Sequence, residues 1–228
     1  MKRLVVVMML GMASIVHGQD GSGEQAKVSP WNGVVFHMDR TGVEPGHYTI
    51  QIQPNGLGAY WIGPPEYDLA EAVGVMKLQV SQRTVDAVAS VFAQVKQGNC
   101  ETKIKNIAQT GKKTILFESA GTSMKCDFNY SDDAGLNRAV EIFESMAATM
   151  QFGARLQREH RFDKLALDAE MASLVNAVKE GRALEVGNIA SVLQSIAEDE
   201  RVIGRARRQA AWLLENAGKS AAVKGAGE

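Results

Sequence analysis

Residues 48–62 read Tyr-Thr-Ile-Gln-Ile-Gln-Pro-Asn-Gly-Leu-Gly-Ala-Tyr-Trp-Ile, and this stretch decides the fold class. Apolar and polar side chains alternate from Tyr48 to Ile52, which predicts a half-buried strand. The Asn-Gly pair that follows tolerates positive φ at both positions and therefore predicts a tight hairpin turn. A return strand is expected over residues 57–62, where a Gly-Pro-Pro run ends it because proline cannot donate a ladder hydrogen bond.

The same alternation predicts further strands on both sides of this hairpin. They are expected at residues 34–38, 76–80, 103–108, 114–119 and 124–130. One helix is expected among them, over residues 82–97, since apolar residues recur at helical spacing between a capping Ser81 and Gly98. Short connections and a single interrupting helix favour an antiparallel sheet in an α+β fold.

The sequence changes character after residue 133, and from there to about residue 217 only helices are expected. Four apolar stripes mark them, at residues 136–150, 162–178, 184–196 and 202–214. The second stripe includes Phe162 and Leu165 among its core-facing members. The predicted organisation is an α+β domain at 33–152 and a helical region at 153–217, with a flexible segment at 19–32 and a disordered tail at 218–228.

The first 18 residues are interpreted as a secretory signal peptide, because Lys2 and Arg3 precede an apolar run that extends to Val16. Cleavage is predicted between Gly18 and Gln19, which gives an exported protein in the periplasm or outside the cell. An uncleaved anchor is the alternative. No later stretch reaches the roughly 20 apolar residues of a membrane span, so no membrane association is expected after cleavage.

The composition is that of an ordinary globular protein, with 228 residues, 45% hydrophobic and 22% charged. The formal net charge is −1, and removal of the signal peptide leaves 23 Lys or Arg residues against 26 Asp or Glu. The basic residues between 201 and 208 stand next to three acidic ones and predict a solvated helix face. A nucleic-acid partner is therefore not expected.

The two cysteines, Cys100 and Cys126, both follow the signal peptide. Export to an oxidising compartment makes one intramolecular disulfide the prediction. Two buried thiols are the alternative, whereas a catalytic thiol would need a base or cation to lower its pKa. Neither cysteine has an obvious histidine partner in the sequence.

The 48–60 hairpin, the segment Val-Ser-Gln-Arg-Thr-Val-Asp-Ala-Val at 80–88 and the segment Gly-Lys-Lys-Thr-Ile at 111–115 together resemble uncharacterised bacterial exported α+β domains. That family is similar in its N-terminal strand, hairpin, helix and Gly-Lys-Lys strand, and the resemblance covers about residues 33–150. It implies a fold and carries no activity.

A non-enzymatic binding or interaction module is the preferred functional hypothesis, with an unidentified protein or small molecule as partner. Its candidate surface is the hairpin exit, where aromatic rings and rigid prolines gather and where interfaces often have hot spots. The residues of this surface are Tyr60, Trp61, Pro64, Pro65 and Tyr67. The alternative is that Tyr60 or Trp61 caps the core of the sheet.

A metal-dependent hydrolase is the second hypothesis, because His37, Asp39 and His47 lie on or beside neighbouring predicted strands. Serine-nucleophile and phosphate-loop motifs are missing from the sequence, so neither a catalytic residue nor a cofactor is predicted outside this trio. A third hypothesis makes the helical region the partner-binding element and the sheet its scaffold.

Overall fold

The computed structural model describes residues 33–63, 74–92, 100–102, 111–119 and 122–217. These ranges contain one antiparallel sheet of six strands in the order β4-β3-β2-β1-β5-β6. The strands are β1 (Gly33–Asp39), β2 (His47–Ile52), β3 (Leu57–Trp61), β4 (Met76–Gln79), β5 (Lys112–Ser119) and β6 (Thr122–Phe128). The predicted α+β class with an antiparallel sheet is confirmed.

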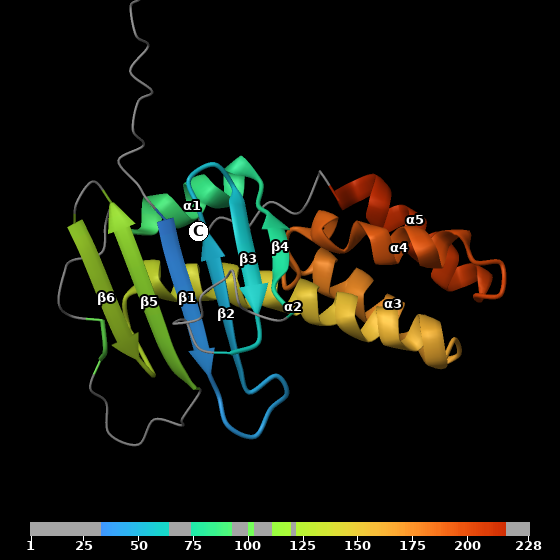
Figure 1. The fold of residues 1–228 in the computed structure, drawn as a ribbon, viewed down its shortest axis with the longest axis horizontal. Coiled ribbons are helices and arrows are strands. Elements are labelled where there is room, and N and C mark those ends of the chain that lie inside the picture. The colour runs from blue at the N-terminus through green and yellow to red at the C-terminus, as the bar shows by residue number, and fades with distance from the viewer. Residues whose placement is uncertain (1–32, 64–73, 93–99, 103–110, 120–121, 218–228) are drawn as a thin grey trace, which may run out of the picture.

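Two helices cover one face of this sheet, α1 (Gln82–Phe92) and α2 (Ala134–Phe162), and both lie behind it in Figure 1. The strand register explains which side chains meet them. Phe36 stands opposite Ile50 on one neighbouring strand and opposite Ile115 on the other, and all three are fully buried. The alternation read from the sequence therefore corresponds to a continuous apolar face.

Phe143 anchors α2 on that apolar face. Its ring stacks on Phe36 with ring centroids 4.8 Å apart and an interplanar angle of 5°. Phe143 is fully buried, and truncation of such a ring to alanine typically costs about 3–5 kcal/mol. This contact ties the first half of α2 to the centre of the sheet.

The second half of α2 extends beyond the sheet and packs with α3 (Ala166–Lys179), η1 (Val186–Ile189) and α4 (Ala190–Glu198). The last helix, α5 (Gly204–Asn216), packs against α3 and α4. The helix is continuous through residues 152 and 153, where the sequence pattern predicts a boundary between two regions. The third apolar stripe forms η1 and α4. Gly153 lets η1 approach α2 closely, because a Cβ at that position would lie 2.4 Å from the Ile189 side chain.

Two polar side chains, one in η1 and one directly before it, connect the helical region to the sheet. The side-chain amide of Asn188 forms two hydrogen bonds with the backbone of Gln79 on β4. It accepts from the Gln79 N–H at 2.7 Å and donates to the Gln79 carbonyl at 3.1 Å. The Glu185 carboxylate accepts hydrogen bonds from the Ser81 N–H at 3.1 Å and from the Ser81 and Thr84 hydroxyls, each at 2.6 Å. Glu185 thereby caps the start of α1, where backbone N–H groups lack helical partners.

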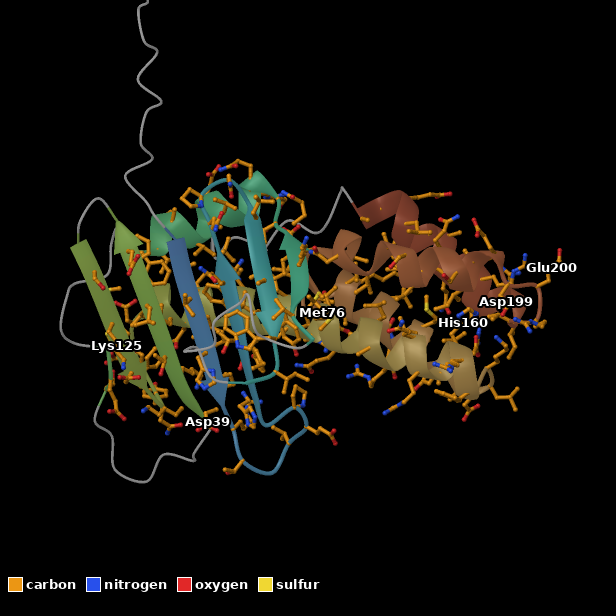
Figure 2. All side chains as sticks on the ribbon, in the orientation of Figure 1. Asp39, Met76, Lys125, His160, Asp199 and Glu200 are labelled. Atoms are coloured by element: carbon orange, nitrogen blue, oxygen red, sulfur yellow. A yellow bond between two sulfur atoms is a disulfide. The ribbon has the colours of Figure 1, made fainter. Side chains whose placement is uncertain are left out.

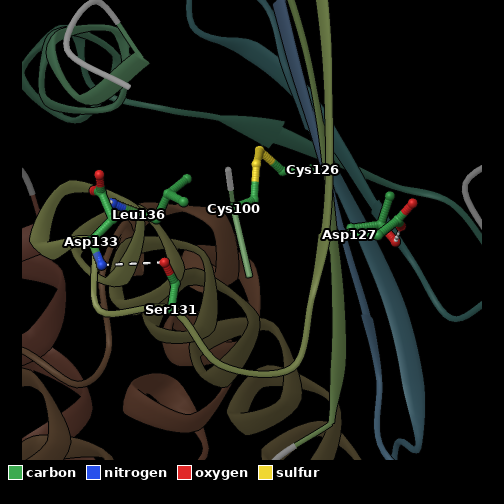
Figure 3. Close-up of a disulfide and its surroundings, with 7 residues drawn as sticks. Cys100, Cys126, Asp127, Ser131, Asp133 and Leu136 are labelled. Carbon is green, nitrogen blue, oxygen red and sulfur yellow. Dashed lines mark hydrogen bonds between the residues drawn. A yellow bond between two sulfur atoms is a disulfide. The ribbon is translucent and has the colours of Figure 1, made fainter. Parts of the chain in front are cut away.

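A disulfide joins Cys100 to Cys126 of β6, as the sequence predicts, with the two Cα atoms 5.6 Å apart (Figure 3). Residues 100–102 continue beside the segment that leads into α2. The Thr102 N–H donates to the Tyr130 carbonyl at 3.0 Å, and its hydroxyl donates to Asp132 at 2.5 Å. The bridge therefore lies next to the start of α2, where Asp133 accepts a hydrogen bond from the Leu136 N–H.

Some predicted elements fall partly or wholly outside the described residues. The strand expected at 103–108 lies outside them, and the helix expected at 82–97 is described from Gln82 to Phe92. Among the helices that are described, none combines the length and apolarity needed to cross a membrane.

Candidate functional site

A cleft of about 660 Å³ opens where the sheet meets the helical region. Three parts of the chain form it: the connection between β1 and β2, the middle of α2, and the turn between α3 and η1. Its volume lies within the range of pockets that hold small molecules. Its lining residues are Met38, Arg40, Val43, Glu44, Pro45, Tyr48, Arg138, Glu141, Ile142, Glu144, Ser145, Ala148, Gln151, Glu180, Gly181, Arg182 and Leu184.

The buried part of the cleft lining is apolar apart from one hydroxyl. Met38, Ile142 and Leu184 are buried, and Tyr48 is 6% exposed. The Tyr48 ring lies against Tyr60, with centroids 5.9 Å apart. Burial and the nearby Glu144 carboxylate raise the pKa of Tyr48 well above its ordinary value. The phenol is therefore neutral at physiological pH and can donate a hydrogen bond.

An ion pair crosses one side of the cleft. Arg40, which follows β1, donates to the Glu144 carboxylate of α2 at 2.9 Å. Both side chains are more than one-third exposed, so the pair contributes little to stability. It does fix the loop after β1 against α2, together with the hydrogen bond from the Arg40 N–H to the Gly46 carbonyl at 2.6 Å.

Two further Arg–Glu pairs stand on the cleft wall. Arg138 donates to Glu141 at 2.9 Å on the same helix, and Arg182 contacts Glu180 at 2.5 Å. Glu44 adds a fourth carboxylate to the lining. The cleft therefore presents guanidinium and carboxylate groups side by side above an apolar base.

Hydrogen bonds to α2 hold the far rim in place. The Ser145 hydroxyl donates to the Gly181 carbonyl at 3.2 Å, and the Leu184 N–H donates to the Ser145 carbonyl at 3.2 Å. The buried Thr149 hydroxyl donates to the Leu184 carbonyl at 2.6 Å. The turn after α3 is thus attached to α2 at several points, and the cleft is preformed.

Two residues of the predicted hairpin-exit surface, Tyr60 and Trp61, lie within the described part of the chain. Tyr60 and Trp61 are consecutive in β3 and so point to opposite faces of the sheet. Tyr60 packs among the core side chains, and burial raises the pKa of its hydroxyl. Trp61 is also buried, at 3% exposed. Pro64, Pro65 and Tyr67 lie outside the described residues.

The predicted metal trio is only partly brought together. His47 stands opposite Asp39 across β1 and β2, and both are exposed. His37 Nδ1 lies 2.9 Å from the Thr49 hydroxyl, which donates to the Gly63 carbonyl at 2.7 Å. Nδ1 therefore donates to Thr49. Across the described part of the chain, no group of three or more His, Cys, Asp or Glu side chains is placed to hold a metal ion.

The cleft could not be predicted from the sequence, because its residues come from segments about 100 positions apart along the chain. The i,i+3 spacing of Arg138 and Glu141 was visible, but such pairs are common on solvated helices. Comparison with models of known protein families, with curated proteins and with solved structures found no match.

Proposed function

We propose that this chain is an exported binding protein without catalytic activity and that the cleft beside Tyr48 is its ligand site. The observation that carries the proposal is the composition of the cleft, which combines a preformed apolar base with charged pairs at its wall. The basic-then-apolar N-terminal segment supports export. Purification of the processed protein and N-terminal sequencing tests that part, with Gln19 as the expected first residue.

Binding fits the cleft better than proton-transfer chemistry. Arginine keeps its proton at any ordinary pH, so a guanidinium held by a carboxylate orients a ligand and does not act as an acid or base. The neutral Tyr48 hydroxyl adds a hydrogen-bond donor at the apolar base. A few polar groups around an apolar pocket are typical of small-molecule sites.

The arrangement favours a ligand that carries both signs of charge beside an apolar group, such as an amino acid or a short peptide. A ligand carboxylate matches the geometry of an arginine such as Arg182. A ligand ammonium matches Glu44, whose carboxylate is exposed at the opening. An apolar side chain would then lie over Met38 and Tyr48.

The test is thermal denaturation of the purified protein with a panel of amino acids and dipeptides, followed by calorimetric titration of those that stabilise it. A ligand at about 100 times its Kd stabilises the folded state by about 2.7 kcal/mol. Tyr48→Phe should weaken binding about three- to tenfold through the loss of one hydrogen bond. Arg182→Gln should weaken it about tenfold or more.

Two matched variants serve as controls, because neither residue lines the cleft. Tyr130→Phe removes a tyrosine hydroxyl outside the cleft and is the control for Tyr48→Phe. Arg83→Gln removes a guanidinium from the exposed face of α1 and is the control for Arg182→Gln. Both should bind as the unmodified protein does. A panel in which no compound stabilises the protein, or equal binding by Tyr48→Phe, Arg182→Gln and the controls, would contradict the proposal.

A further inference from the structure

Two large apolar side chains project from the end of the molecule that is farthest from the sheet. Phe162 is 73% exposed and Leu165 is 80% exposed, and both lie at the turn between α2 and α3. The sequence pattern placed them in a buried helical stripe. The turn instead directs them away from the core, so their exposure needs another explanation.

This end is held in a fixed shape. The carboxylate of Asp199, between α4 and α5, accepts hydrogen bonds from Lys164 at 2.7 Å and Arg201 at 2.9 Å, and lies 3.0 Å from His160 Nε2. Figure 2 shows His160, Asp199 and the neighbouring Glu200 together at the end of the helices. The two turns therefore form one surface, which we call the distal tip and define as residues 158–168 and 199–208.

The distal tip is basic, whereas the chain as a whole is not. It contains seven Lys or Arg residues and five Asp or Glu residues, against 25 and 26 in the whole chain. Arg158 and Arg161 are exposed and make no ion pair within the described part of the chain, and the Arg161 guanidinium lies 5.0 Å from the centre of the Phe162 ring. Cationic groups thus flank the projecting apolar side chains.

We propose that the distal tip docks on an anionic lipid surface, with Phe162 and Leu165 inserted at the headgroup level and Arg158 and Arg161 paired with lipid phosphates. Charge complementarity and shape support this occupant. Arginines beside apolar side chains are typical of peripheral membrane contacts. The tip also lies at one end of the longest axis of the molecule, so it can reach a flat surface without obstruction from the sheet (Figure 1).

This inference is independent of the proposed ligand cleft, which lies at the junction with the sheet. It revises the expectation that the exported chain has no membrane contact. That expectation considered transmembrane spans, whereas a peripheral contact needs only a few exposed side chains and a favourable charge.

The experiment is co-sedimentation of the processed protein, purified from the exported fraction, with lipid vesicles. Vesicles of phosphatidylcholine are compared with vesicles that also contain phosphatidylglycerol. We expect binding to the anionic vesicles only, and weaker binding at high salt because exposed charges are screened. Phe162→Ser with Leu165→Ser should weaken it about tenfold. Arg158→Gln and Arg161→Gln should each weaken it about fivefold.

The matched controls are Ile62→Ser, which removes a side chain that is 62% exposed after β3, and Arg83→Gln on α1. Both should bind as the unmodified protein does. Equal binding to both vesicle types, or unchanged binding by the tip variants, would overturn the inference. A lipid-independent dimer that Phe162→Ser abolishes in light scattering would also overturn it, and so would tip-dependent binding to an acidic protein without binding to lipid.

Discussion

The two ends of α2 are secured by different chemistry. Its first turn lies beside the Cys100–Cys126 disulfide, whereas its last turn is held to the α4–α5 turn through Asp199. A covalent bridge is insensitive to salt and to moderate pH but is lost to a reductant. Ion pairs are weakened by salt and by changes in pH but are not affected by a reductant. One helix therefore connects a contact that is sensitive to reductant, at its first turn, to a contact that is sensitive to salt and pH, at its last turn.

Of the changes that test this comparison, removal of the disulfide should have the largest effect on stability. The cysteines are 26 positions apart, and closure of a loop of that size stabilises a protein by about 3.5 kcal/mol in the chain-entropy model. Cys100→Ala with Cys126→Ala should lower the free energy of unfolding in urea by that amount. The unmodified protein with a reductant should behave like the double variant. An unchanged urea midpoint would show that the bridge is not structural.

Loss of the Asn188 contact should have a smaller effect, because it removes two exposed hydrogen bonds between the helical region and β4. Asn188→Ala should cost about 1–2 kcal/mol, which lowers the Tm by about 2–8 °C in a chain of this size. Hydrogen exchange should also become faster at the Gln79 N–H. Asn176→Ala, at an exposed position on α3, is the control. Equal effects of the two variants would mean that Asn188 does not join the regions.

The ion pairs at the distal tip should have the smallest effect and a specific pH dependence. Hydrogen bonds from Arg201 and Lys164 hold the pKa of Asp199 well below its usual value. A lowered carboxyl pKa stabilises the folded state above the unfolded-state value of about 3.9, and the contribution is lost as the pH falls through the folded-state pKa. Asp199→Asn should therefore lower the Tm by about 2 °C or less near neutral pH.

The difference in Tm between the unmodified protein and Asp199→Asn should be constant above about pH 5 and should shrink below about pH 4. Glu200→Gln is the control, because its exposed carboxylate makes no ion pair among the described residues. A difference that grows as the pH falls would show that Asp199 does not act through its ionised form. Calorimetric scans between about pH 2 and 7 give this comparison.

Local periodicity predicted the sheet better than it predicted the helical region. Along β1 and β2 the pleat sends every second side chain into the core, so the alternation from Tyr48 to Ile52 indicated both the strand and its buried face. The hairpin at Asn55 and the cysteine pair could also be predicted, since each depends on nearby residues or on the compartment. The strand order required long-range contacts that no local pattern contains.

The helical stripes were correct about helix content and less accurate about position. A period of 3.6 residues shows which face of a helix is apolar but does not show where the chain leaves the core. Phe162 and Leu165 fitted the stripe, although α2 ends at Phe162 and Leu165 precedes α3. The cleft could not be predicted from the sequence for a related reason. Arg40 and Glu144 become neighbours only after the sheet and α2 pack together.

The Asn188 amide also protects part of the edge of the sheet from pairing with another molecule. Among the six described strands, β4 is at one edge of the sheet, and the unpaired peptide groups of an edge strand can recruit a strand from another molecule. At Gln79 the amide takes the place of that foreign peptide, using one donor and one acceptor. A side chain cannot extend a sheet, so an intermolecular strand could pair with Gln79 only after it displaces the Asn188 amide.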